Sequence, residues 1–434
     1  MINQAPEKIL IINSQFSIIN YFQVFFVQPQ YFFARLNNQI MLLRAAQTTF
    51  LFLIFSLCLM QPFFYFSGLR VIATDFLFLA AFALWLLALI FRQTKFRRHD
   101  FFWLLVFYFL TMAVSVVFSV NPRSSLIKLL AELYLLSLPV LAFNLIGTEA
   151  ELRRALHVWL AATGFVVSVG VVSIFVFYLD RDSRLLSYTL FSFGSLPPGN
   201  YPRLMLTFLN ANMLCNYLSV SLLILLILRK LGRVNLKIFS ALLAGILICS
   251  IFTVSAGLGG IALCLGVWLW LEYRKSNLFV ARSSLLAGGL AGVALVFALL
   301  ISPNLHPTAP FVVELPFSET RIAPSARIMT WTDSWKTFLE NPLTGRGLGQ
   351  DACYVTYFDS SGFMQTLTDA HNVWLNLAAQ TGVFGLLAII LIIYYLSRRT
   401  FPLNFDRRES VYRIGLGLAF FGAFVYQGIG GSYE

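Results

Sequence analysis

Charged residues are scarce in this chain of 434 residues, at 12%, whereas hydrophobic residues make up 59%. A typical soluble domain contains roughly 25% charged residues, so the composition excludes an ordinary soluble protein. The chain also has few residues that bind metals or form disulfides, with five cysteines and four histidines. Neither type shows the paired spacing of a disulfide framework or a zinc site. We therefore expect no metal site and no cofactor.

The chain contains many long apolar runs. A helix needs about 20 apolar residues to cross a bilayer, and eleven runs are read as spans: 48–67, 72–91, 101–120, 124–146, 155–178, 205–228, 237–254, 258–272, 284–302, 372–396 and 412–431. Residues 10–44 are Phe-rich and amphipathic, which fits an interfacial helix, and they lack the small-residue cleavage site of a signal peptide. The pattern predicts an all-α polytopic membrane protein with about 11–12 transmembrane helices.

One long polar segment interrupts the apolar runs. It predicts four regions in the chain: an N-terminal cytoplasmic or interfacial segment (1–47), a bundle of about nine helices (48–302), an extracytoplasmic loop with short helices and catalytic elements (303–370), and C-terminal transmembrane helices (371–434). Because arginines, tryptophans and a histidine gather in the loop and at its exit, we expect any chemistry there.

The net positive charge of the chain lies entirely on one predicted face of the membrane. The N-terminus and five loops on that face hold 21 of the 31 Lys and Arg but 7 of the 19 Asp and Glu, a net charge of +14. The rest of the chain has a net charge of −2. This asymmetry indicates the cytoplasmic face, and the scatter over five loops argues against nucleic acid as a partner. The 303–370 segment is therefore predicted to be extracytoplasmic.

Lys128 and Glu132 are the exceptional charges near the centre of a predicted span. Their i,i+4 spacing allows them to pair on one helix face. One interpretation is a self-neutralised pair that faces other helices or an outer cavity. The other is a proton or ion relay, since charges inside a membrane are costly and often functional. The lack of a detectable inverted repeat or of paired broken helices favours the first interpretation.

Two short motifs resemble known functional motifs, but in each case another interpretation is better. The stretch Gly345–Gly349 reads Gly-Arg-Gly-Leu-Gly, but it follows no predicted strand and lacks the Lys-Ser/Thr ending of a phosphate loop. A turn or a close approach of two backbones is the better interpretation. Asp180 and Asp182 match the Asp-x-Asp pattern of metal-dependent glycosyltransferases that use nucleotide sugars, and a solvated outer loop explains them better.

The polar segment contains a predicted helix from about Pro324 to Glu340, which ends before Asn341–Pro342 because the residue before a proline avoids the helical region. Three aromatic residues recur along it at i, i+4 and i+7: Trp331, Trp335 and Phe338. Such a stripe suits a helix on a membrane surface. Arg327 lies one turn before Trp331 and could reach lipid phosphates. An ordinary amphipathic helix with a snorkelling arginine is the alternative.

His371 stands at the entrance of the next predicted span. Thr368 or Asp369 could cap that helix, and the partial positive charge of a helix N-terminus favours a neutral imidazole. A general base must be neutral, although Asp369 favours the charged form. A boundary histidine without a catalytic role is the alternative.

Arg203 follows an outer loop and leads directly into the predicted span 205–228. Its planar guanidinium suits bidentate phosphate contacts, and a membrane-boundary anchor is the alternative. Asn210 and Asn212 are predicted to lie two turns inside this span, where amides need hydrogen-bond partners within the bundle.

These motifs together resemble the O-antigen ligase/polymerase superfamily of bacterial membrane glycosyltransferases, over roughly residues 200–395. The resemblance is carried by the following stretches: Ser325-Ala326-Arg327, Trp331, Asn341 to Gly349, His371-Asn372, Leu375, Gly382 and Gly385, and, earlier, Arg203-Leu204, Thr207-Phe208, Asn210, Asn212 and Tyr217. The chain has Ala211 where the family often has proline. Near residues 255–257 the family often has Ser-Arg-Gly, whereas this chain reads Ser-Ala-Gly. Arg321 is the candidate substitute for that arginine.

The resemblance implies transfer of a glycan from a polyprenyl-diphosphate carrier to a lipid or saccharide acceptor, on the periplasmic side of a bacterial inner membrane. The transfer would be inverting and independent of metal. It implies His371 as the general base and three arginines as diphosphate ligands: Arg203, Arg327 and Arg321. The implied supporting residues are Asp369, Asn372, Asn210 and Trp331. Membrane lipids are the other expected partners.

Two alternatives to a ligase stay open. A polymerase of the same superfamily would extend one lipid-linked chain with another, and the motifs do not separate it from a ligase. A transporter of lipid-linked glycan or polysaccharide would instead need polar tracks through the membrane. The chain ends at Glu434 on the predicted outer side, where relatives usually continue, so a truncated final region is also an expectation.

Overall fold

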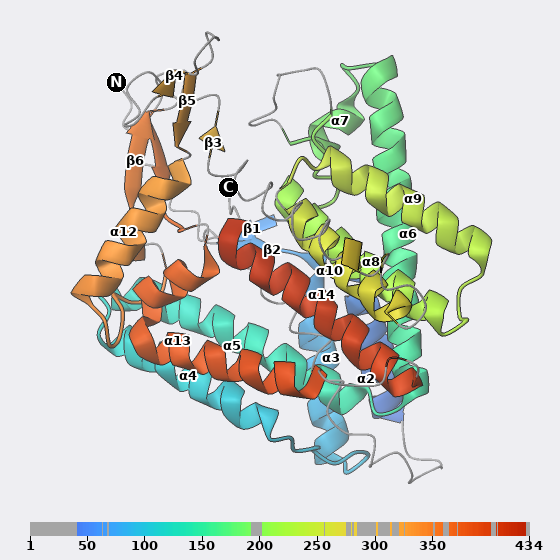
Figure 1. Ribbon diagram of the computed structural model, residues 1–434. Coiled ribbons are helices and arrows are strands. Elements are labelled where there is room, and N and C mark those ends of the chain that lie inside the picture. Colours follow the sequence, from blue (N-terminus) through green and yellow to red (C-terminus); the bar gives the residue numbers. More distant parts are fainter. Residues whose placement is uncertain are drawn as a thin grey trace. The chain divides into compact units, whose positions relative to one another are not determined.

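The structure is a computed structural model, which describes residues 41–62, 64–66, 69–191, 202–255, 257–274, 279, 282–283, 301–302, 313–314, 321–324, 326–349, 352–358, 364–370, 372–400, 405 and 407–430. Within these residues there are twelve helices and three small antiparallel sheets (Figure 1). The protein is thus an all-α polytopic membrane protein, as its composition predicts.

Several helices have the dimensions of membrane spans. Among the described residues, five are long and apolar enough to cross a bilayer: α3 (Ala73–Ile90), α5 (Pro122–Leu145), α6 (Glu149–Leu179), α8 (Ala211–Lys230) and α13 (Val373–Thr400). Four further apolar helices are shorter: α2 (Met41–Ser56), α4 (Phe101–Val117), α9 (Leu236–Phe252) and α10 (Gly257–Tyr273). The predicted span 284–302 lies outside the described residues except for Ile301–Ser302, and the interfacial stretch 10–44 does so up to residue 40.

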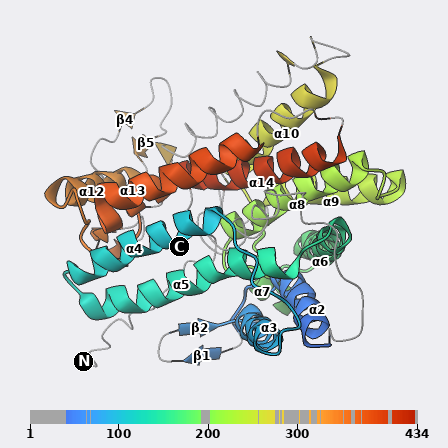
Figure 2. The same cartoon turned by 90° about the horizontal axis from the view of Figure 1, so that it is seen from below.

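The chain divides into two compact units. The first comprises Met1–Arg98 and Leu135–Val254. In it α2 packs on α3 and α6, and α6 also packs on α8 and α9 (Figure 2). Helix α8 is almost entirely buried. It is joined to α6 by a buried polar contact in which Trp159 Nε1 donates to Ser221 Oγ at 2.9 Å. The short helix α7 (Arg184–Thr189) and the hairpin β1 (Phe64–Phe66) and β2 (Leu69–Val71) complete this unit.

The second unit comprises His99–Tyr134 and Ser255–Glu434. Its central helix is α13, which packs on α4, on α12 (Ala326–Glu340) and on α14 (Arg408–Gly430), while α10 packs on α14. Three short strands form an antiparallel sheet in the order β3 (Ile301–Ser302), β5 (Arg321–Pro324) and β4 (Val313–Glu314). The hairpin of β6 (Val355–Phe358) and β7 (Met364–Leu367) lies beside α12.

Within each unit, contacts between helix ends join segments that the charge pattern assigns to the same side of the membrane. In the first unit, Arg97 Nη2 donates to the carbonyl of Ile146 at 2.8 Å, on the predicted cytoplasmic side. On the predicted outer side, Leu204 N donates to the carbonyl of Phe252 at 2.9 Å. In the second unit, α4 and α13 also meet with ends that are predicted to lie on the same side, because the two helices run antiparallel. Their predicted cytoplasmic ends are joined by a ring contact between His99 and Tyr395.

The first predicted span is wrong at its second half. Helix α2 ends at Ser56, and the chain does not continue as a helix to residue 67, because Phe64–Phe66 pairs with Leu69–Val71 as antiparallel strands. The backbone N–H groups of Met60 and Gln61 donate to the carbonyl of Thr207, and Pro62 has no N–H with which to extend a helix. At the start of this stretch the apolar side chains of Leu57, Cys58 and Met60 are buried.

Candidate functional site

Helix α12 is the first element of the site, and it begins and ends where Pro324 and Asn341–Pro342 predict. Three small hydroxyl side chains on one face are buried: Thr330, Ser334 and Thr337. Three large apolar side chains on the opposite face are exposed: Ile328, Trp335 and Leu339. This arrangement reverses the usual pattern of a helix on a soluble core and suits a membrane surface. Of the predicted aromatic stripe, Trp335 is exposed, while Trp331 and Phe338 are partly covered.

Helix α12 is fixed to the segment that precedes α13. Thr330 Oγ1 donates to the carbonyl of Ala370 at 3.3 Å, and both residues are fully buried. Cys353 Sγ donates to the carbonyl of Thr330 at 3.7 Å, which secures the same turn from the other side. Arg327 lies one turn earlier on the face of Thr330, because residues three apart share a helix face. The helix that carries Arg327 is thus held against the residue that precedes His371.

Asn372 caps α13. Its Oδ1 accepts hydrogen bonds from the backbone N–H groups of Trp374, at 3.0 Å, and Leu375, at 3.2 Å. The prediction that Thr368 or Asp369 caps this helix is wrong, because the helix begins at Val373 and its cap position is therefore 372.

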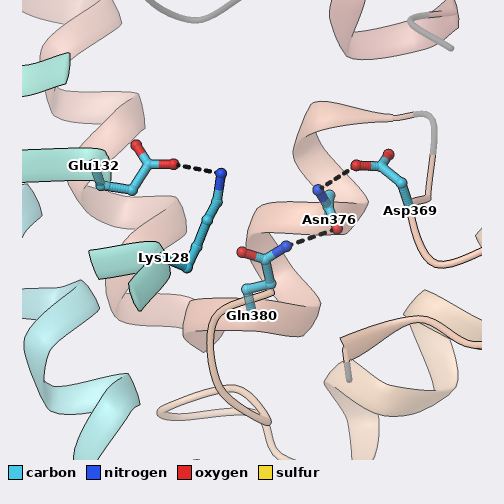
Figure 3. Close-up of polar contacts among 5 residues, drawn as sticks. All are labelled: Lys128, Glu132, Asp369, Asn376 and Gln380. Carbon is cyan, nitrogen blue, oxygen red and sulfur yellow. Dashed lines mark hydrogen bonds and ion pairs between the residues drawn. The ribbon is translucent and has the colours of Figure 1, made fainter. Parts of the chain in front are cut away.

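Asp369 instead ends a ladder of amides along the first half of α13. Asn376 Nδ2 donates to Asp369 Oδ2 at 3.2 Å, and Gln380 Nε2 donates to Asn376 Oδ1 at 3.0 Å (Figure 3). Amides inside a membrane helix are costly unless they are hydrogen-bonded. Sequence reasoning missed this ladder, although Asn376 and Gln380, spaced i,i+4 in an apolar run, were the signal for it.

The loop Gly345–Gly349 lies against two other segments of the same unit. Gly345 (φ 69°) faces the backbone of Gln380, and Gly347 (φ 114°) faces Ser119, so closely that a Cβ at either position would overlap its neighbour. Arg346 N donates to the carbonyl of Ala379 at 2.9 Å. The prediction of a turn with close backbone approach is therefore confirmed.

Helix α4 and the segment before this loop stabilise a break in α13. Gly382 has φ 64° and ψ −159°, which divides the helix into two halves. The carbonyl of Gln380 accepts a hydrogen bond from Ser115 Oγ, and Val383 N donates to the carbonyl of Pro342 at 2.8 Å. Irregular backbone at membrane depth is tolerated only where such partners satisfy it. The outer half of α13, with its amides, is therefore rigidly positioned.

Arg203 belongs to the first unit. Its Nε donates to the carbonyl of Thr253 at 3.2 Å, and its guanidinium carbon lies 5.0 Å from the centroid of the Phe191 ring. Asn210 does not lie inside a span as predicted. It is the N-cap of α8, where its Oδ1 accepts from Met213 N at 2.9 Å, because the chain before Ala211 is not helical. Asn212, two residues later, is in the first turn of α8 and buried.

A comparison with protein families finds one match, which lies almost entirely in the second unit. Residues 253–390 match the family model described as O-antigen ligase. This segment is similar to the O-antigen ligases. Neither the curated proteins nor the solved structures gave a match to the chain. The resemblance inferred from the motifs is therefore confirmed for the region that contains the polar segment and most of α13.

The matched segment, residues 253–390, contains most of the predicted site residues. The structure places Arg321 in β5, opposite Glu314 of β4, and Arg327 in the first turn of α12. The indole nitrogen of Trp331 is enclosed and has no hydrogen-bond partner among the described residues. His371 lies outside the described residues, between Ala370 and Asn372.

The predicted residues fall into two sets. The first set lies where α12 packs on the start of α13, and it consists of Asp369, Asn372 and the helix positions of Arg327 and Trp331. Arg203 and Asn210 lie in the first unit and outside the matched segment.

Proposed function

We propose that this protein is a glycosyltransferase that moves a glycan from a polyprenyl-diphosphate carrier to an acceptor at the periplasmic face of the inner membrane. Support comes from the O-antigen ligase match over residues 253–390 and from one contact in that segment. The hydrogen bond from Thr330 to Ala370 fixes the helix that carries Arg327 against the residue before His371. Arg327 would supply the cation from α12, and His371 would supply the base from the segment before α13, the helix on which α12 packs.

The chemistry follows from the residue types. Diphosphate is a good leaving group whose developing negative charge is stabilised by positioned cations. Arg327 and Arg321 would supply that charge, with guanidinium groups that bind phosphate in a bidentate manner. His371 would remove the proton from the acceptor hydroxyl as it attacks the anomeric carbon. Attack opposite the leaving diphosphate inverts that carbon.

Helix α12 supports placement of this reaction at the membrane surface. Its exposed apolar face suits the headgroup boundary, which is the depth of the diphosphate of a lipid carrier. The acceptor decides between a ligase and a polymerase: a lipid or other acceptor makes the enzyme a ligase, and a second lipid-linked glycan makes it a polymerase.

The central experiment is replacement of His371 by Ala. The purified protein is assayed with a polyprenyl-diphosphate glycan and an acceptor, in the presence of a chelator. Loss of a general base typically lowers the rate about 10²- to 10⁴-fold, while donor affinity should change little because the arginines remain. His157→Ala is the matched control, because His157 is exposed on α6 and its Nδ1 bonds to the backbone carbonyl of Arg153, one turn earlier on the same helix.

Three outcomes would contradict parts of the proposal. Unchanged turnover in His371→Ala would remove this residue from the mechanism. Turnover that the chelator abolishes would indicate a metal-dependent reaction, with Asp180 and Asp182 the first residues to replace. Movement of glycan across sealed vesicles without any glycosyl product would favour the transporter.

A further inference from the structure

A second polar cluster lies within the membrane-spanning part of the second unit. Lys128 Nζ and Glu132 Oε1 on α5 are 3.1 Å apart, and their side chains are only 10% and 13% exposed. Figure 3 shows this pair beside the Gln380–Asn376–Asp369 ladder, with the Gln380 carbonyl oxygen turned to the side on which Lys128 lies. We propose that these five residues bind adjacent hydroxyl groups of the acceptor sugar. The inference rests on the proposed glycosyl transfer.

Contacts of the glycine loop bring the two parts of the cluster together. Ser125 Oγ donates to the carbonyl of Leu348 at 2.9 Å, and Lys128 follows Ser125 by one turn on the same face of α5. The backbone of Gln380 lies against Gly345 at the other side of this loop. The part of α5 that carries Lys128 and the part of α13 that carries Gln380 are therefore both held by the same short loop.

The cluster has unused hydrogen-bonding capacity. An ammonium group has three donors, and among the described residues Lys128 has one ion-pair partner, Glu132. Glu132 likewise has one ion-pair partner there, and the Gln380 side chain has only the bond from its Nε2 to Asn376. Buried donors and acceptors without partners are costly. The remaining groups are thus suited to a ligand.

Charge and chemistry select the class of ligand. Lys128, Glu132 and Asp369 sum to a formal charge of −1, which disfavours the diphosphate of the donor. The mixture of ammonium, carboxylate and amide groups matches sugar hydroxyls, each of which both donates and accepts. The ladder ends at Asp369, two residues before the proposed general base. A sugar held along it would present its hydroxyl to that base.

Depth favours a sugar that is attached to a lipid. Lys128 lies six residues and Glu132 ten residues after Pro122, the first residue of α5. At a rise of 1.5 Å per residue these positions are about 9 and 15 Å along the helix. A sugar at this depth is more readily delivered from the bilayer than from solution.

The test is the double variant Lys128→Met/Glu132→Leu, assayed for transfer from a polyprenyl-diphosphate glycan to a panel of decyl glycosides. Replacing a buried ion pair by apolar residues of similar volume is often neutral or stabilising, so this variant should fold. We expect KM for the decyl glycoside to rise roughly 10-fold or more, as for loss of hydrogen bonds to charged groups. Donor KM and hydrolysis of the donor by water should be unchanged.

Two further variants keep the proposal falsifiable. Lys336→Met/Glu340→Leu removes a second i,i+4 pair, which is 75% and 52% exposed, and it should leave acceptor KM unchanged. Gln380→Met tests the ladder alone if the double variant fails to fold, and it should also raise acceptor KM.

The outcomes separate this inference from the proposed function. An active wild-type protein whose folded Lys128/Glu132 and Gln380 variants keep the wild-type acceptor KM would overturn the inference and leave the function intact. A wild-type protein that transfers no glycan to any acceptor would overturn both.

Discussion

Individual side chains of the candidate site differ in how strongly the fold constrains them. Thr330 and Ala370 are buried and joined to each other, and Asp369 is held by Asn376. Cys353 lies beside them, and burial raises the pKa of its thiol to about 12. The thiolate is the reactive form, so Cys353 should be inert at neutral pH in the folded protein. The surroundings of the site are thus a packed support and not a reactive centre.

Arg327→Lys tests the diphosphate role at the level of one residue. The substitution keeps the positive charge but removes the planar fork, and losing a charge-assisted hydrogen bond typically costs about 1.5–3 kcal/mol, or roughly 10- to 150-fold. We expect kcat/KM for the donor to fall within this range while membrane insertion is normal. Arg184→Lys, at an exposed arginine of α7, is the matched control. Full activity in Arg327→Ala would exclude a diphosphate role.

Helices and loops explain which parts of the site were predictable from sequence. Prolines at 324 and 342 bracket α12, and proline acts locally, so its boundaries were predictable. The start of α8 was not, because hydropathy continues through residues 204–208 while Leu206 takes a positive φ of 52° and Asn210 caps the helix. The break in α13 depends on the loop around Gly345, which is distant in sequence. Hydropathy reports burial and cannot detect such long-range contacts.

Gly345→Ala tests whether the glycine loop holds the two halves of α13. A positive φ costs a residue with a Cβ about 1–2 kcal/mol, and overlap with the Gln380 backbone adds about 1–3 kcal/mol. Gly232→Ala provides the control, since Gly232 has a similar φ of 67° but no atom lies within 4 Å of the position that its Cβ would take. We expect the unfolding temperature in detergent to fall clearly more for Gly345→Ala. Equal shifts would mean that the close approach contributes nothing.

At the scale of the molecule, the charge asymmetry and the contacts of each unit support the same arrangement of sides. Each contact between helix ends joins segments that were assigned to the same side from charge alone, as at Arg97–Ile146 and Leu204–Phe252. Which side faces the cytoplasm stays a prediction from the positive-inside rule.

Cysteine labelling in intact cells checks that orientation. A cysteine at the exposed position of Lys336 should react with a membrane-impermeant maleimide, and one at the exposed position of Arg233 should react only after permeabilisation. The five natural cysteines are all buried, so background labelling should be low. The opposite pattern would invert the topology and remove the proposed periplasmic site.

The reversed faces of α12 also limit how this protein can be dissected. Its hydroxyl face is covered by residues that lead into α13, and its apolar face is left outside. Residues 303–370 produced alone in water would lose the packing of α12 on α13 and would leave the apolar face of α12 in contact with water. We expect such a fragment to aggregate, as seen by size-exclusion chromatography, unless detergent micelles are present. On this expectation, helix α12 is an extension of the membrane bundle and not part of a detachable soluble module.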